Sequence, residues 1–263
     1  MIDFTGHVAN GQPFSEIPII DAHNHIGRWN AFHVPNGGTI EQMIAKMDLL
    51  GIDRVCLTAH ASIGPDYIYG NDIVQDALDR FPARTVGYVT VNPNYPDDMP
   101  HELARCFAHP GFRAIKMHPA CHGHSVDHTG YTAAFEEAER RGCAILIHIW
   151  GQGDVMAVDR LAPRYPHAQF IMAHTGGDVH SMAVALGVIR KHANVYGDLA
   201  ISTALEGNVE WFVSEVGANK IIFGTDMPFF DPSPAVARVA MARITEQEKR
   251  DIFSANISAL LGL

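Results

Sequence analysis

The chain has 263 residues, of which 47% are hydrophobic and 18% are charged, so it can bury a large core. This composition excludes an intrinsically disordered protein. The formal net charge of −10 offers no basic surface to a phosphate backbone, which argues against nucleic acid as a partner.

Short apolar runs rich in β-branched residues recur along the whole chain, and each has the length of a strand. Near-continuous apolarity is typical of strands that are buried on both faces of a parallel sheet. The eight predicted strands are residues 17–22, 54–58, 85–91, 112–117, 144–149, 169–173, 194–199 and 220–224.

Helical patterns lie between these strands. The first begins at a capping box of Thr39 and Gln42 and stops at Gly51, and the last begins at a second box of Thr245 and Glu248. The other predicted helices are residues 71–81, 98–108, 131–141, 154–163, 181–192 and 205–216. Strand–helix units repeated in this way predict one (β/α)8 TIM barrel, a single domain over residues 1–263, because an open doubly wound sheet more often has a glycine-rich turn after its first strand.

Histidine, lysine and aspartate occur where several predicted strands end. In chain order, the ends of strands one, four, five, six and eight carry His23 with His25, Lys116 with His118, His148, His174, and Asp226. In a TIM barrel these carboxyl ends form the face that carries the active site. Residues i and i+2 of a strand point to the same side, so the first two histidines can both face the barrel mouth. Imidazoles together with a carboxylate suit a first-row divalent metal, so we predict a metal centre.

Each of these residues also has an ordinary structural explanation. A single histidine in an apolar strand is more often a hydrogen-bonded core residue, and this applies to His148 and to His174 taken alone. Asp226 taken alone could equally serve the turn that follows it. Their joint placement at one end of one barrel is harder to explain in this way.

Segments spread along the chain resemble the amidohydrolase superfamily and, more narrowly, its amidohydrolase-2 branch: IIDAHNHIG, GFRAIKMHP, ILIHIW, FIMAHTGG, IIFGTDMPF and the closing IFSANISALLGL. The resemblance runs from Ile17 to Leu263. It implies a distorted TIM barrel that holds one or two divalent metal ions, often zinc; manganese would also suit such a site. The metal ligands that it implies are His23, His25, His148, His174 and Asp226.

Lys116 poses a separate question, because a cationic lysine beside a metal ion would repel it. In binuclear members of the superfamily a lysine at the end of strand four is carboxylated and bridges two metals, which would make Lys116 a further ligand. Two alternatives are that the ammonium binds an anionic substrate, or that it pairs with a carboxylate such as Asp21 or Asp226.

The resemblance and the residues together predict a metal-dependent hydrolase of a small amide, lactone or ester. In this mechanism a metal-activated water attacks the substrate, Asp226 is the general base, and His174 and His118 complete the catalytic set. The alternative is a metal-dependent non-oxidative decarboxylase of a small aromatic or unsaturated carboxylic acid, since the branch includes such enzymes. A non-catalytic metal-binding barrel is a third hypothesis.

The remaining features concern partners and compartment. A small-molecule carboxylate could pair with Arg28, Arg113 or Lys116, and Trp150 is a candidate platform for it. The four cysteines form no CxxC pair, which predicts free thiols in a reducing compartment. We find no signal peptide and no membrane-spanning run, so we expect a cytoplasmic protein without a membrane or nucleic-acid partner, and a homo-oligomer is compatible with the sequence.

Overall fold

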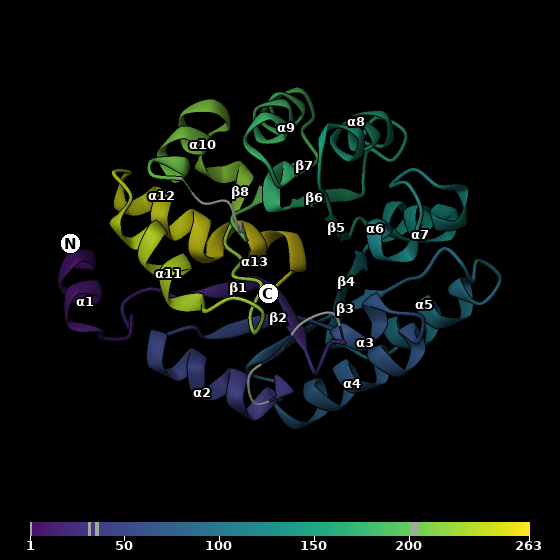
Figure 1. The fold of residues 1–263 in the computed structure, drawn as a ribbon, viewed down its shortest axis with the longest axis horizontal. Coiled ribbons are helices and arrows are strands. Elements are labelled where there is room, and N and C mark those ends of the chain that lie inside the picture. The colour runs from purple at the N-terminus through teal and green to yellow at the C-terminus, as the bar shows by residue number, and fades with distance from the viewer. Residues whose placement is uncertain (1, 31–32, 35–36, 201–204) are drawn as a thin grey trace.

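The computed structural model describes residues 2–30, 33–34, 37–200 and 205–263. Its eight parallel strands lie in the sheet in the same order as along the chain, and helices surround them (Figure 1). The strands are β1 (Ile20–Ile26), β2 (Arg54–Ala59), β3 (Thr85–Thr90), β4 (Phe112–Met117), β5 (Ala144–His148), β6 (Gln169–Ala173), β7 (Val195–Asp198) and β8 (Ile221–Ile222). The predicted TIM barrel is thus confirmed, and the bounds of β4 and β6 agree with the prediction.

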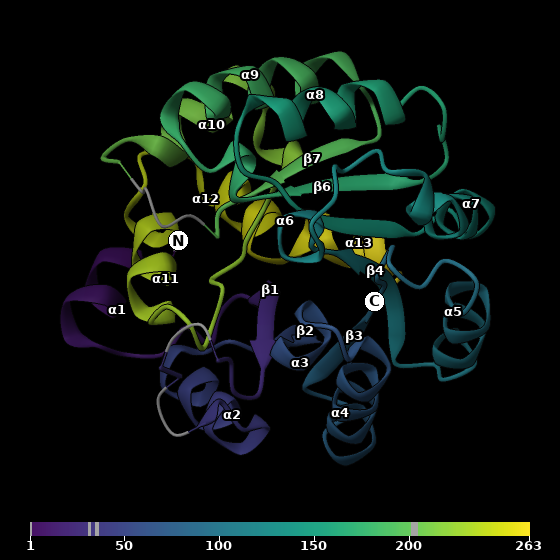
Figure 2. The same ribbon diagram turned by 45° about the vertical axis from the view of Figure 1, so that its right-hand side comes forward.

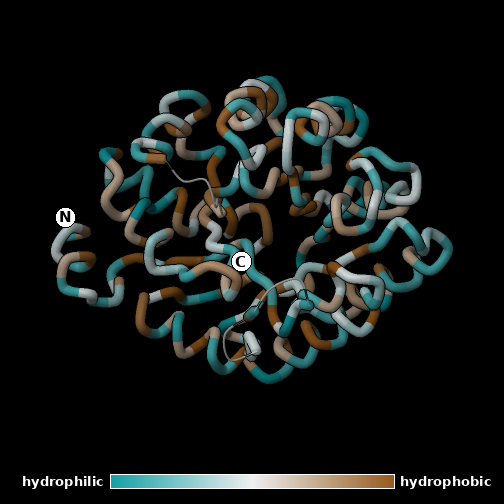
Figure 3. Tube along the Cα trace, in the orientation of Figure 1, coloured by the Kyte–Doolittle hydropathy of each residue, from teal (hydrophilic) through white to brown (hydrophobic). Residues whose placement is uncertain are grey.

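Helices cover the outside of the strands, with α8, α9 and α10 along one side and α2 and α4 along the opposite side, and α13 lies across one end of the barrel (Figure 2). They are α1 (Phe4–Asn10), α2 (Ile40–Leu50), α3 (His60–Ile63), α4 (Tyr67–Arg80), α5 (Met99–Phe107), α6 (Pro119–His122), α7 (Thr132–Arg141), α8 (Gln152–Leu161), α9 (Val179–Lys191), α10 (Asn208–Val216), α11 (Pro232–Met241), α12 (Glu246–Arg250) and α13 (Asn256–Leu261). Hydrophobic and hydrophilic residues alternate along the outer helices, as expected for helices with one buried face (Figure 3).

Four helices were absent from the prediction: α1, α3, α6 and α11. The longest of them, α11, nevertheless has ordinary start signals, since Asp231 accepts a hydrogen bond from Ser233 N at 2.8 Å and Pro232 occupies the first helical position. The predicted second capping box is confirmed, with Thr245 N donating to Glu248 Oε2 at 2.7 Å.

The first strand differs most from its prediction, because it covers Ile20–Ile26 rather than residues 17–22. Its end is set by the segment that follows β8: Asp226 N donates to His23 O at 2.8 Å, and His25 N donates to Met227 O at 2.9 Å. Asp21 strengthens the same seam, since its carboxylate accepts from Thr225 N at 3.0 Å and Thr225 Oγ1 at 2.5 Å. These bonds close the barrel and bring Asp226 against the two histidines of β1.

The interior of the barrel is filled by inward-facing side chains of the strands, such as Cys56 and Tyr88, together with Ile257 and Leu261 of α13. The final helix therefore packs under the strands at the end where they begin, which leaves the opposite end for polar side chains. No helix within the described part of the chain is both long enough and apolar enough to cross a membrane.

Candidate metal centre and active site

Three buried side chains from different strand ends converge at the mouth of the barrel. His23, His174 and Asp226 each offer one ligand atom, and these atoms all lie within 4.8 Å of one another. His25 joins them, since its Nε2 lies 3.3 Å from Asp226 Oδ1. A set of imidazole nitrogens and one carboxylate at this spacing has the chemistry of a divalent metal site.

The histidine rings are oriented by hydrogen bonds on their outer nitrogens. His23 Nδ1 donates to Asp198 Oδ2 at 2.8 Å, His174 Nδ1 donates to the carbonyl of Ala200, and His25 Nδ1 lies 2.5 Å from Thr58 Oγ1. Because a carboxylate and a carbonyl accept these bonds, Nδ1 carries the proton in His23 and His174, and each of these two rings turns an unprotonated Nε2 toward the centre. These residues therefore fit a metal ion through their orientation as well as through their type.

Electrostatics keeps these groups in the form that a metal needs. Burial lowers the pKa of His23 and of His25 well below the ordinary value, which makes both rings neutral. Burial alone would raise the pKa of Asp226, but the neighbouring His23, His174 and Lys116 outweigh it and hold that pKa below its ordinary value. Neutral imidazoles and an ionised carboxylate are the protonation states that bind metal.

The backbone at this centre adopts a conformation that side-chain-bearing residues rarely take. His174 has φ 61°, Thr175 has φ 43° and Asp226 has φ 61°. Thr175 Oγ1 donates to Asp198 O at 2.6 Å, which helps to hold this turn. Strained left-handed residues cluster at functional sites, because the surrounding structure has to hold them there at a cost in stability.

Lys116 lies fully buried on β4, and its Nζ is 3.0 Å from His23 Nε2. It therefore approaches the nitrogen that His23 turns toward the centre. Burial lowers the pKa of this lysine to about 8. The carboxylate of Asp21, one of its suggested partners, is instead engaged by Thr225.

His148 and His118 form a second layer beside the centre. His148 Nδ1 lies 3.1 Å from His174 Nε2, and the ring of His118 stacks on that of His148 with centroids 3.9 Å apart. Burial lowers the pKa of both rings well below the ordinary value, so both are neutral. His148 thus contacts a residue of the cluster directly, whereas His118 is joined to it through His148.

The three cationic candidates for a substrate carboxylate have different positions. Arg113 is exposed near the start of β4, so it lies far along the strand from the mouth and is not suited to this role. Arg28 is exposed and follows β1 at the mouth. Lys116 is the buried cation beside the metal-ligand candidates.

Sequence reasoning missed Asp198 at the end of β7 and Thr58 on β2, which orient the ligand candidates. Asp198 Oδ1 also accepts from His174 N at 2.7 Å and Ala200 N at 3.2 Å. A signal existed for Asp198, because a carboxylate inside a strand predicted to be buried requires partners. Nothing comparable marked Thr58, since threonine is ordinary in a strand.

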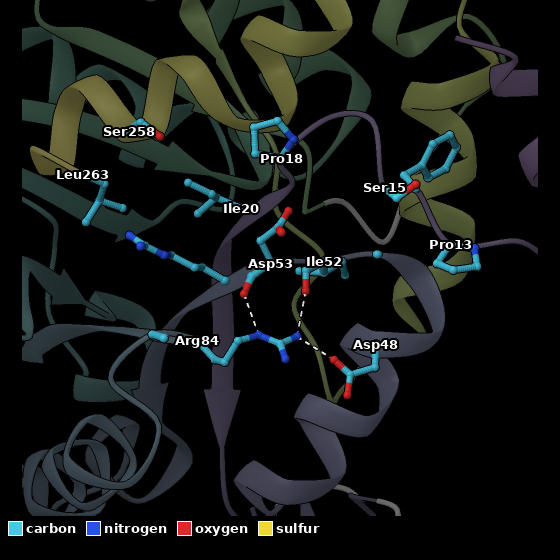
Figure 4. Close-up of a pocket in the computed structure, with 14 residues that line it drawn as sticks. Pro13, Ser15, Pro18, Ile20, Asp48, Ile52, Asp53, Arg84, Ser258 and Leu263 are labelled. Atoms are coloured by element: carbon cyan, nitrogen blue, oxygen red, sulfur yellow. Dashed lines mark hydrogen bonds and ion pairs between the residues drawn. The ribbon is translucent and has the colours of Figure 1, made fainter.

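A groove of about 850 Å³ lies at the opposite end of the barrel, where the strands begin (Figure 4). Arg84 crosses it, donating to Asp53 O at 2.8 Å, Asp48 Oδ1 at 2.7 Å and Ile52 O at 3.1 Å. These bonds fasten the loop before β3 to the end of α2 and to the loop that follows α2. The groove lacks the converging imidazoles of the mouth, so we assign the chemistry to the mouth.

Known proteins resemble this chain in sequence and in fold. The 2-amino-3-carboxymuconate-6-semialdehyde decarboxylase of Dictyostelium discoideum is 23% identical, over 74% of this chain and 66% of that protein. The crystal structure of 5-carboxyvanillate decarboxylase from Novosphingobium aromaticivorans, complexed with manganese and 4-hydroxy-3-methoxy-5-nitrobenzoic acid, has a TM-score of 0.78 at 16% identity, covering 96% of this chain and 99% of that one. The 2,6-dihydroxybenzoate decarboxylase from Rhizobium has a TM-score of 0.76 at 16% identity, covering 94% and 99%.

These three proteins are decarboxylases by name, whereas the family pattern that matches this chain is described as amidohydrolase. The chain spans about two thirds of the length of the Dictyostelium relative that it matches, 66%. The amidohydrolase family pattern, by contrast, matches residues 20–263, nearly the whole chain. This protein belongs to the amidohydrolase superfamily, in its amidohydrolase-2 branch.

Proposed function

We propose that this protein is a metal-dependent, non-oxidative decarboxylase of a small aromatic or unsaturated carboxylic acid. The observation that carries the proposal is the buried cluster of His23, His174 and Asp226, whose candidate ligand atoms all lie within 4.8 Å of one another. The chain also belongs to a family of enzymes. The choice of decarboxylation over hydrolysis rests on the named activities of the relatives.

His23, His25, His174 and Asp226 are the residues that would hold the metal, with His148 beside them as a further ligand candidate. When bound, the ion would supply positive charge that attracts the substrate carboxylate and stabilises negative charge developing on the substrate. Manganese is present in the 5-carboxyvanillate decarboxylase structure, so we propose manganese or zinc.

Decarboxylation breaks the bond between a carbon atom and the carboxyl group, and the bonding electrons stay on that carbon. CO2 leaves, and a proton takes the vacated position. We assign the handling of this proton to Asp226, whose ionised carboxylate would first take up one proton from solvent and then deliver it to the vacated carbon; its Oδ1 lies 3.3 Å from His25 Nε2 and 3.8 Å from His23 Nε2. His174 and His118 are the proposed assisting rings, because one lies in the cluster and the other borders it through His148.

The test compares two substrate panels on protein loaded with Mn²⁺. One panel holds 2,6-dihydroxybenzoate, 5-carboxyvanillate and related unsaturated acids, and the other holds small esters, amides and lactones. We expect CO2 release and the decarboxylated product from the first panel. Turnover confined to the second panel would overturn the proposal and restore the hydrolase.

For Lys116 we propose carboxylation, which would make it an additional metal ligand. Its ammonium lies 3.0 Å from His23 Nε2, so an unmodified lysine and a metal ion would compete for the same lone pair. Carboxylation replaces the cation with an anion and removes this conflict.

The variant Lys116→Ala tests this proposal. It should lose one metal equivalent per chain and regain part of its activity with a short-chain carboxylic acid. Full metal content with a raised KM would instead make Lys116 a substrate-binding cation. Unchanged metal content, KM and kcat would leave only a structural role. Lys220→Ala is the matched control, because Lys220 lies just before β8, at the opposite end of the barrel.

A further inference from the structure

Aromatic rings line the barrel mouth on two sides of the proposed metal centre. On the β5 side, Trp150 is 47% exposed, and its ring centroid lies 6.4 Å from that of His148 and 5.9 Å from that of His174. On the β1 side, Trp29 lies 5.2 Å from His60 and 6.3 Å from His118 by the same measure. Each tryptophan therefore borders histidines that are packed at the centre.

The two sides are joined by the stacked pair of His118 and His148, whose ring planes differ by 15°. The indole of Trp150 is also nearly parallel to His148, with an interplanar angle of 13°. The ring planes of His118 and Trp150 therefore each lie within 15° of that of His148, while Trp29 meets His118 at 84°, edge to face. A flat molecule that stacks on the ring of His148 or Trp150 lies close to parallel with the other.

The backbone holds Trp150 in its place at the mouth. Its amide N donates to Asp154 Oδ2 at 3.1 Å, and the following Gly151 N donates to Gly176 O at 3.0 Å. The indole lies directly on Gly177, since a Cβ at that position would come within 2.5 Å of the ring. One part of the indole is thus covered by protein, and about half of the residue remains open to solvent beside the centre.

We propose that Trp150 and Trp29 bind the flat unsaturated ring of the substrate and select planar acids over aliphatic ones. The inference rests on the proposed function, because it assumes that the acid substrate reaches the metal centre. A large, fixed and exposed aromatic surface beside such a centre favours a ligand that can cover it, and aromatic rings interact well in parallel offset or edge-to-face arrangements. Both arrangements are available here, one on the Trp150 side and the other on the Trp29 side.

The chain has three tryptophans, which allows a controlled test. Trp211 lies on α10, outside the barrel, and packs against Phe212. The probes are 4-hydroxy-3-methoxy-5-nitrobenzoic acid, which is planar, and cyclohexanecarboxylate, which carries the same carboxylate on a puckered aliphatic ring. Calorimetry measures the Kd of both probes for Mn²⁺-loaded wild type, Trp150→Ala, Trp29→Ala and Trp211→Phe, so turnover is not needed.

Trp150→Ala should weaken binding of the planar probe about tenfold and leave the Kd for cyclohexanecarboxylate within about twofold. Trp29→Ala should act in the same direction, and Trp211→Phe should change neither Kd. Circular dichroism verifies that the variants fold, which the exposure of Trp150 favours. Equal losses for both probes, or no loss for the planar probe, would overturn the inference.

The outcomes also separate this inference from the proposed function. Selective binding of the planar probe without CO2 release from any acid would refute the decarboxylase and leave the ring-binding assignment standing. CO2 release together with a Trp150→Ala variant that binds both probes like wild type would support the decarboxylase and refute the ring-binding assignment.

Discussion

The two ends of this barrel use charged residues in opposite ways. At the end where the strands begin, the Arg84 guanidinium donates hydrogen bonds to the Asp48 carboxylate and to the carbonyls of Ile52 and Asp53. At the mouth, histidine Nε2 atoms and the Asp226 carboxylate point at one another across distances such as 3.3 and 3.8 Å. The first end joins complementary groups, whereas the second gathers groups that need a further ligand.

The backbone shows the same contrast. Among the described residues, positive φ outside glycine occurs only at His174, Thr175 and Asp226, all at the mouth. Such residues cost stability, so they persist where the surroundings enforce them for function. In TIM barrels the carboxyl end of the strands carries catalysis and the other end carries stability. Changes at the mouth should therefore alter activity, and changes at the other end should alter the free energy of unfolding.

The largest expected effect comes from removing metal. Dialysis against a chelator should abolish turnover, because the mouth groups lose the ion that they are oriented to hold, and Mn²⁺ or Zn²⁺ should restore it. Elemental analysis before and after dialysis gives the metal content beside the rate. Full activity in protein that contains no metal would show that the groups at the mouth do not act through a metal ion.

Asp226→Asn should lower kcat by about 10²–10⁴, because asparagine retains an oxygen but cannot hold the proton. The fold should survive, as measured by circular dichroism. Asp53→Asn is the matched control at the other end, where Asp53 Oδ2 accepts from Ile19 N at 2.7 Å, and it should leave kcat unchanged. A near-normal rate in Asp226→Asn would transfer the proton role to His174.

The sequence predicts the barrel well where the strands are defined locally. β4 and β6 are mostly apolar runs, and their bounds were predicted to the residue. β1 is shifted from its predicted range and β8 is shorter than predicted, because their ends depend on the closing bonds from Ala22 N to Phe223 O and from Asp226 N to His23 O. Such pairing between the two ends of the chain leaves no periodic pattern in the sequence.

The candidate site shows a similar division. His23, His25, His174 and Asp226 could be predicted from their residue types and strand-end positions, and the structure brings them together. Asp198 could not be assigned a role, because its partner His23 lies 175 positions away in the sequence. The sequence does not identify which metal ion is bound, since imidazole and carboxylate suit several first-row ions.

Asp198→Asn should weaken metal binding about 10- to 100-fold, the usual effect of losing a partner that orients a ligand. The carboxylate accepts N–H groups on both oxygens, from His23 on one side and from His174 N and Ala200 N on the other. The asparagine side chain would place its NH2 group against one of these N–H donors. It would thereby favour the His23 tautomer that carries the proton on Nε2 instead of Nδ1. Competition with a chelator measures the Kd.

Asp159→Asn is the matched control for that variant. Asp159 belongs to α8 and pairs with Lys191 and His192, outside the barrel. Its variant should keep the wild-type metal affinity. An unchanged Kd for metal in Asp198→Asn would show that the bond from His23 to Asp198 does not orient the metal ligand. The geometry of the mouth would then not depend on Asp198.

The smallest expected effect, and the one that examines the other end of the barrel, is that of Arg84→Ala. The variant leaves the carbonyls of Ile52 and Asp53 without their charged donor, so the free energy of unfolding should fall by about 1–2 kcal/mol. Urea denaturation measures this change, and kcat/KM should stay at the wild-type value because the mouth is at the opposite end. Arg80→Ala is the control, since Arg80 makes exposed ion pairs with Asp76 and Glu41 and lies over the neighbouring ring of Phe81, and exposed ion pairs contribute roughly 0–1 kcal/mol. A loss of kcat in Arg84→Ala at unchanged stability would mean that the two ends are coupled, and the division of the barrel into a catalytic end and a stabilising end would fail.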